Sequence, residues 1–137
     1  MCIRDRLGTN PNSVLLVSED AHSSFVKCIK VMGLDTRNLV RIKTDNQGRM
    51  DINDLKKSLD KCSIEDKKIF AIVATLGTTV RGAIDPIKEI SEICKQRNIW
   101  LHIDGSIGGV FAITSIPIEG LNTVSYTHLT LPTSDLV

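Results

Sequence analysis

Short apolar runs alternate with amphipathic segments along most of this chain, and this alternation restricts the possible folds more than any other feature. Four runs, at 14–17, 39–42, 69–75 and 99–103, have the length and composition of buried strands. The segments between them carry apolar residues at helical spacing. Because strands that alternate with helices pair in parallel through crossover connections, the sequence predicts an α/β fold with a mainly parallel sheet and flanking helices.

Each expected helix has its own start or stop signals. Asp20 and Asp51 are the expected N-caps of the first two helices, and Gly33 is expected to end the first. Asp85 is the expected N-cap of the third helix, with Pro86 at the first helical position. The expected buried stripes are Phe25, Cys28, Ile29 and Met32, then Ile52, Leu55, Leu59 and Cys62, and then Ile87, Ile90 and Cys94.

Composition excludes several classes of partner. The chain has 137 residues and a net charge of +1, so its charge predicts no attraction to nucleic acid or to acidic lipid. No run reaches the ~18 apolar residues of a membrane span, and the first residues, MCIRDR, lack the apolar stretch of a secretory signal. The cysteines at 2, 28, 62 and 94 form no CxxC pair, which argues against zinc and against a disulfide framework. We therefore expect a cytoplasmic protein, in which Cys28 and Cys94 act as small hydrophobic residues.

The segment Trp100–Gly109 runs from a strand directly into a carboxylate and a glycine-rich loop. Residues 100–103 suit a strand that is buried on both faces, and Asp104 falls where that strand should end. Ligands of open α/β sheets bind beyond the carboxyl ends of the strands, so Asp104 is a candidate site residue. The alternative is that Asp104 caps the following turn. His102 and Asp104 have the i, i+2 spacing of metal ligands, but no third ligand of matching type is evident and no metal site is predicted.

The loops after the first and third expected strands carry polar residues at the same end of the sheet. His22 is either a site residue or an imidazole satisfied by nearby backbone. Thr78 and Thr79 either face a ligand or satisfy loop amides, and Arg81 either clamps an anion or lies in solvent. Three convergent strand ends make a stronger case for a site than any one of them.

Four motifs follow one another in this chain: AHSS at 21–24, GRMD at 48–51, ATLGTTVRGAIDPI at 74–87 and WLHIDGSIGG at 100–109. In their order and spacing they resemble the pyridoxal-phosphate-dependent group II amino-acid decarboxylases. That family includes the glutamate, aromatic-amino-acid and diaminobutyrate decarboxylases, and the resemblance covers about residues 12–112. It implies the large domain of pyridoxal-phosphate fold type I (aspartate-aminotransferase-like), pyridoxal 5'-phosphate as cofactor, an amino acid as substrate, and a homodimer.

The resemblance also implies roles for individual residues. His22 matches the catalytic histidine that stacks on the cofactor ring and helps to position the substrate. Asp104 matches the aspartate that pairs with the pyridine nitrogen, where a carboxylate keeps the nitrogen protonated and the ring able to accept electrons. Thr79 matches a threonine near the cofactor's oxygen substituents and the substrate. Ser106 stands where the family often has alanine against the ring, because Gly105-Ser106 replaces a commoner Ala-Ala pair.

The implied reaction removes the α-carboxylate of an L-amino acid through an external aldimine. Two alternatives use the same cofactor: a carbon–carbon lyase of the sphingosine-phosphate lyase kind, and a cysteine desulfurase relative. An alternative of another class is a cofactor-free α/β binding module. The Schiff-base lysine of the family lies well downstream of the aspartate, and this chain has no lysine after Lys95.

The family's phosphate-binding Ser/Thr-rich loop also has no counterpart before His22. We therefore expect residues 7–123 to be a central slice of the large domain, inactive by itself, and a lysine to follow roughly fifty residues beyond Asp104 in the complete reading frame. Residues 1–6 and 124–137 resemble translated sequencing-adapter peptides and are interpreted as non-native tails. Tyr126 and His128 lie in the second tail and have no expected role.

Overall fold

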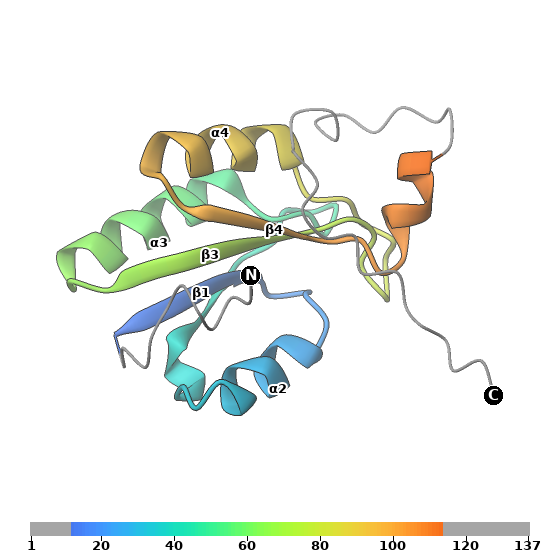
Figure 1. Ribbon diagram of the computed structural model, residues 1–137. Helices are drawn as coiled ribbons and strands as arrows, with labels where there is room; N and C mark the ends of the chain where they lie inside the picture. The colour runs from blue at the N-terminus through green and yellow to red at the C-terminus, as the bar shows by residue number, and fades with distance from the viewer. Residues whose placement is uncertain (1–11, 114–137) are drawn as a thin grey trace.

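The computed structural model describes residues 12–113, and it confirms the predicted α/β fold (Figure 1). Residues 1–6 and 124–137, interpreted as non-native tails, lie outside the described residues, as do both ends of the expected slice 7–123. The elements are β1 (Ser13–Ser18), α2 (Ser24–Val31), the 3-10 helix η1 (Thr36–Asn38), β2 (Leu39–Ile42), α3 (Ile52–Ile64), β3 (Lys68–Thr75), α4 (Ile87–Arg97), β4 (Trp100–Asp104) and the 3-10 helix η2 (Gly108–Ile113).

The four described strands form one sheet in the order β2-β1-β3-β4, and every neighbouring pair is parallel. In the centre of the sheet, Leu16 pairs with Val40 on one side and with Ile72 on the other. The strand order changes direction between β1 and β3, because β2 is added on one side of β1 and β3 on the other. Such a switch point opens a crevice at the carboxyl ends of the two strands, where α/β proteins bind their ligands.

Helices cover both faces of the sheet. Figure 1 shows α3 and α4 on one side and α2 on the other. Because successive side chains of a strand point to opposite faces, each strand contributes to two separate cores. The core under α3 and α4 includes Leu16, Ile72, Leu55, Leu59 and Ile90. The smaller core under α2 includes Leu15, Val17, Ile29, Ala71 and Val73, with Phe25 and Trp100 packed at its margin. None of the helices in residues 12–113 is long and apolar enough to cross a membrane.

Strand β4 differs from the prediction that both of its faces are buried. Only Ile103 is buried in this strand, whereas Trp100, Leu101 and His102 are half-buried. The physical reason is position, since β4 is the last strand of the described sheet and has a described neighbour only in β3. The predicted end of the strand is confirmed, because Asp104 is its last residue.

The helix starts were predicted correctly in one case and wrongly in two. Asp51 caps α3, and its side chain accepts hydrogen bonds from the backbone N–H groups of Asn53 and Asp54. Asp20 does not cap α2, whose N-cap is Ser23. Asp85 does not cap α4, which has Pro86 at the N-cap position and no side-chain capping bond. Both aspartates make tertiary contacts instead.

The two cysteines predicted to be small core residues also differ from each other. Cys94 is buried on α4, as expected, whereas Cys28 is exposed on α2. Helix α2 has only eight residues, and Ile29 is its only buried residue. The apolar stripe of this helix is therefore narrower than the sequence pattern indicated, and Cys28 lies outside it.

Candidate functional site

The carboxyl ends of β1, β3 and β4 lie along one edge of the sheet, because these strands are parallel neighbours. Thr75 is the last residue of β3 and pairs in register with Asp104, the last residue of β4. Beyond this pair, the Leu76 backbone N–H donates to the carbonyl of Asp104 at 2.9 Å, and the Gly108 N–H donates to the carbonyl of Leu76 at 2.8 Å. The ends of β3 and β4 and the start of η2 thus form one hydrogen-bonded unit.

Asp104 is half-buried, and its contacts bear out the capping role that the sequence left open as one alternative. Its Oδ1 accepts a hydrogen bond from the Ser106 hydroxyl at 2.6 Å and from the Ser106 N–H at 3.2 Å, so it does cap the turn after β4. Its Oδ2 accepts no hydrogen bond from residues 12–113. One carboxylate oxygen is therefore used to hold the loop, and the other has no hydrogen-bond partner among the described residues.

His22 is exposed in the loop between β1 and α2, and its Nδ1 accepts a hydrogen bond from the Ser24 N–H at 3.2 Å. This is the local backbone contact that the sequence offered as the alternative to a site role. An accepting Nδ1 carries no proton, so in the neutral ring the proton lies on Nε2. The bond also restricts the orientation of the imidazole, which is a property that a ring-stacking residue requires.

The two threonines after β3 have different environments. Thr78 is buried, and its Oγ1 accepts a hydrogen bond from the Ala83 N–H at 3.1 Å, which confirms the loop-amide interpretation for this residue. Thr79 is exposed. The Thr78 bond, together with the backbone bond from the Thr78 N–H to the Ala83 carbonyl at 2.9 Å, closes the loop between β3 and α4 and leaves Thr79 on its outer side.

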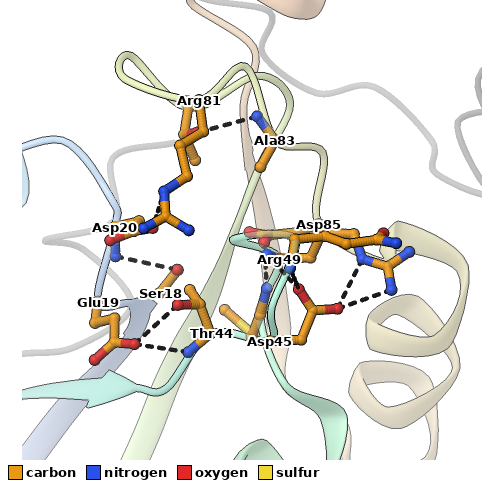
Figure 2. Close-up of polar contacts among 12 residues, drawn as sticks. Ser18, Glu19, Asp20, Thr44, Asp45, Arg49, Arg81, Ala83 and Asp85 are labelled. Atoms are coloured by element: carbon orange, nitrogen blue, oxygen red, sulfur yellow. Dashed lines mark hydrogen bonds and ion pairs between the residues drawn. The ribbon is translucent and has the colours of Figure 1, made fainter.

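Arg81 is exposed, as one of the two interpretations of the sequence expected, and its side chain also reaches a neighbouring loop. Its Nε is 3.9 Å from Oδ2 of Asp20, the aspartate that was wrongly predicted to cap α2. Figure 2 shows the Arg81 side chain reaching across to the loop that carries Asp20. The stem of Arg81 also covers Gly48, because a Cβ built at Gly48 would lie 2.9 Å from Cδ of Arg81. Arg81 therefore joins the loops that follow β1, β2 and β3.

A second contact joins the loops after β1 and β2. The carboxylate of Glu19 accepts hydrogen bonds from the Thr44 N–H at 2.8 Å and from the Thr44 hydroxyl at 2.9 Å (Figure 2). These bonds lower the pKa of Glu19 below its ordinary range. The loop that carries His22 is thus held through Glu19 by Thr44 and through Asp20 by Arg81.

Asp85, like Asp20, does not have the capping role that the sequence predicted. Its side chain is buried and accepts hydrogen bonds from the backbone N–H groups of Met50 and Thr75, each at 2.7 Å. Burial raises the pKa of Asp85, and the two hydrogen bonds oppose that rise. An aspartate between the apolar residues Ile84 and Ile87 is the signal that could have indicated a buried carboxylate.

His102 packs against Phe25 of α2. Its ring makes an edge contact with Phe25, with ring centroids 6.4 Å apart. Residues 12–113 contain no group of three or more histidine, cysteine, aspartate or glutamate side chains that could hold a metal ion. By strand alternation, His102 and Asp104 lie on the face of the sheet that α2 covers.

Known proteins of one family are similar in sequence to this chain. The pyridoxal-dependent decarboxylase conserved domain matches residues 4–123. The mouse acidic amino acid decarboxylase GADL1 is 39% identical over 99 residues, which cover 72% of this chain and 18% of that protein. The human cysteine sulfinic acid decarboxylase is 35% identical over 108 residues, which cover 79% of this chain and 22% of that protein. The chain thus spans about a fifth of the length of these relatives.

Solved structures share the same arrangement of strands and helices. The crystal structure of mouse CSAD is similar with a TM-score of 0.73 and 34% identity, covering 80% of this chain and 23% of that one. The tryptophan decarboxylase of Catharanthus roseus, solved with L-tryptophan, gives a TM-score of 0.74 and 28% identity, covering 82% and 25%. The sheet is therefore part of the fold type I large domain. This chain belongs to the pyridoxal-dependent decarboxylase family.

Proposed function

We propose that the complete protein containing this chain is an amino-acid decarboxylase that uses pyridoxal 5'-phosphate, and that residues 12–113 supply the side of the site that holds the cofactor ring. The observation that carries the proposal is the half-buried carboxylate of Asp104 at the carboxyl edge of the sheet, with one oxygen held by Ser106 and the other open. A protonated ring nitrogen is a suitable partner for such an oxygen.

The residues around Asp104 fit a polar aromatic cofactor. The hydroxyl of Thr75 is buried, and no group in residues 12–113 forms a hydrogen bond with it. Buried hydroxyls without a partner are rare in folded proteins. Thr75 is the register partner of Asp104, so a polar atom of a bound group at this place would satisfy both side chains.

When it is bound, pyridoxal phosphate supplies an aromatic ring that accepts the electrons left behind as carbon dioxide departs. Asp104 serves this chemistry by holding a proton at the ring nitrogen, because a negative charge beside the nitrogen favours its protonated form. The hydrogen bond from Ser106 keeps the carboxylate in one orientation. Ser106 is also the small residue that we place against the ring.

His22 and Thr79 complete the proposed site from the loops after β1 and β3. The bond from the Ser24 N–H to Nδ1 of His22 fixes the imidazole plane, which suits stacking on the cofactor ring and positioning of the substrate. Thr79 presents its exposed hydroxyl from the closed loop after β3, where it can donate to an oxygen substituent of the cofactor or to the substrate. The Arg81–Asp20 contact joins these two loops, and the Glu19–Thr44 contact ties the loop after β1 to the loop after β2.

We further propose an L-amino acid as substrate, a homodimer and a cytoplasmic location, and no nucleic-acid or membrane partner. The support for the substrate class comes from the relatives, which are decarboxylases of acidic amino acids, of cysteine sulfinic acid and of aromatic amino acids. No single amino acid among these classes is favoured by the residues of this chain.

The test is carbon dioxide release by the complete protein from a panel of L-amino acids, including aspartate, cysteine sulfinate and tryptophan. We expect activity that depends on pyridoxal phosphate, and a loss of roughly 100-fold or more in kcat for Asp104→Ala, because an electrostatic partner of the reacting system is removed. Asp51→Ala, which removes a carboxylate from the start of α3, is the matched control and should keep kcat. Turnover without carbon dioxide would favour the lyase or desulfurase alternatives, and absence of pyridoxal phosphate binding would overturn the proposal.

A further inference from the structure

The carboxylate of Asp85 is buried, and both of its oxygens accept hydrogen bonds. The residue is 2% exposed, and each carboxylate oxygen accepts one backbone N–H. Oδ1 accepts from Met50 and Oδ2 accepts from Thr75, each at 2.7 Å. A buried carboxylate is retained in a fold only where such bonds replace its lost hydration.

The contact between Asp85 and Thr75 is reciprocal. The Asp85 N–H donates to the Thr75 carbonyl at 3.0 Å, while the Thr75 N–H donates to the Asp85 carboxylate. Both backbone polar groups of Thr75 are thus held by one residue. The last residue of β3 is fixed in this way at the point where the strand leaves the sheet.

Asp85 does not cap helix α4, although it stands directly before the start of that helix. Helix α4 begins with Pro86 at the N-cap position and has no side-chain capping bond, although an aspartate precedes it directly. A capping aspartate would stabilise the helix start. The side chain turns instead toward Met50, 35 residues earlier in the chain, and toward Thr75.

The contact between Asp85 and Thr75 is linked to Asp104 through the next residue of the chain, Leu76. Thr75 pairs in register with Asp104, and the next residue, Leu76, donates its N–H to the Asp104 carbonyl at 2.9 Å. The Leu76 carbonyl accepts from Gly108, and a Cβ built at Gly108 would lie 2.3 Å from that oxygen. The end of β3 is therefore hydrogen-bonded to Asp104 and lies in close contact with the start of η2.

We propose that Asp85 is a positioning residue for Asp104: its carboxylate fixes the end of β3, and the end of β3 fixes the backbone of Asp104. The proposal rests on the function proposed for Asp104, although the mechanical link itself does not. Asp85 touches neither the cofactor nor the substrate in this scheme. It acts through Thr75 and Leu76.

The test compares Asp85→Asn with Asp51→Asn in the complete protein. Asp51→Asn is the matched control, because the same substitution there removes a carboxylate charge without removing an acceptor. Asp51 accepts both of its N–H bonds at Oδ1, which the asparagine keeps as its amide oxygen, whereas Asp85 accepts one bond at each oxygen. In Asp85→Asn one oxygen becomes an amide NH2, which can no longer accept from an N–H. We expect Asp85→Asn to lower the thermal midpoint by more than Asp51→Asn does. Only Asp85→Asn should raise hydrogen exchange at 75–76 and 104–108 without cofactor, and weaken pyridoxal phosphate binding by about 10-fold or more, as loss of an orienting residue does.

The outcomes separate this inference from the proposed function. If the wild type binds pyridoxal phosphate and Asp85→Asn leaves both the exchange at 104–108 and the dissociation constant unchanged, the inference is overturned while the proposed function stands. If the wild type does not bind pyridoxal phosphate but the variant raises exchange at 104–108, the proposed function fails and the link from Asp85 to Asp104 is supported.

A second variant covers the case in which Asp85→Asn does not fold. Asp85→Glu keeps both acceptor oxygens but lengthens the side chain, so it should displace the end of β3 without leaving an N–H unpaired. Faster exchange at 104–108 and weaker pyridoxal phosphate binding are expected again. Wild-type values of both would contradict the inference.

Discussion

Ser106 donates both its hydroxyl and its N–H to the same oxygen of Asp104, at 2.6 and 3.2 Å. The pair closes the turn after β4 and leaves the second carboxylate oxygen without a partner in residues 12–113. The bonds that close the turn also orient the second oxygen, because a carboxylate held at one oxygen presents the other in a fixed direction.

Ser106→Ala should therefore weaken the site without breaking the fold. The variant loses the hydroxyl bond but keeps the backbone N–H bond, so the turn remains. One hydrogen bond contributes about 0.5–1.5 kcal/mol, and we expect a loss of roughly 3- to 10-fold in pyridoxal phosphate affinity of the complete protein. Ser63→Ala, which removes a hydroxyl bond to the Leu59 carbonyl on α3, is the control and should leave that affinity unchanged. Equal losses in the two variants would show that Ser106 has no special relation to the site.

Gly48→Ala should destabilise the protein for two separable reasons. Gly48 has a φ of +76°, and its added Cβ would lie 2.9 Å from Cδ of Arg81. The left-handed backbone costs about 1–2 kcal/mol for a residue with a side chain, and the contact with Arg81 adds to that cost. Denaturant titration measures the sum.

The two contributions to the Gly48→Ala effect can be separated with variants of this chain. Gly33→Ala has a comparable φ of +74° with nothing within 4 Å, so it should show the backbone cost alone. Adding Arg81→Ala should recover part of the loss in Gly48→Ala and none of the loss in Gly33→Ala. Equal responses of the two glycine variants to Arg81→Ala would contradict the contact.

Thiol reactivity should distinguish the exposed cysteine from the buried ones. Cys28 is exposed on α2, whereas burial raises the pKa of Cys94 to about 12 and also raises the pKa of Cys62. The thiolate is the reactive form, so iodoacetamide should modify Cys28 in the folded protein and reach Cys62 and Cys94 only after unfolding. Mass spectrometry in a Cys2→Ser background checks this. Modification of Cys94 in the folded protein at the rate of Cys28 would be inconsistent with a closed core between α4 and the sheet.

The Glu19–Thr44 contact should make stability depend on pH. Its hydrogen bonds lower the pKa of Glu19 in the folded state, so the ionised carboxylate stabilises the fold. This contribution is complete above the ordinary glutamate pKa of about 4.3, and it is lost as the pH falls through the lower value of the folded protein. Glu19→Gln should therefore be less stable than the wild type near neutral pH, and the difference should shrink in acid.

Denaturant titrations at several pH values measure this difference. Thr44→Val removes the hydroxyl bond but keeps the backbone N–H bond. The difference in unfolding free energy between Thr44→Val and the wild type should also shrink in acid, but it should be smaller than the difference for Glu19→Gln. A difference between Glu19→Gln and the wild type that stays constant from neutral to acid pH would contradict the contact.

Several features of the site could be predicted locally. Asp104 was expected where β4 ends, and it is the last residue of that strand because the apolar run stops there. Asp51 was expected to cap α3, and its carboxylate does so because the partner N–H groups lie two and three residues away. The roles of His22, Thr79, Asp104 and Ser106 toward the cofactor remain predictions.

The sequence by itself determined the strands, the helices and the motifs that resemble one family, because apolar spacing and local end signals act over a few residues. Only the tertiary structure decided the strand order β2-β1-β3-β4 and the partners of the acidic side chains. Asp20 pairs with Arg81, and Asp85 binds the backbone of Met50 and Thr75, although both aspartates occupy positions typical of helix caps. The physical reason is distance along the chain, since these partners become neighbours only when the strands have paired and their carboxyl ends lie side by side.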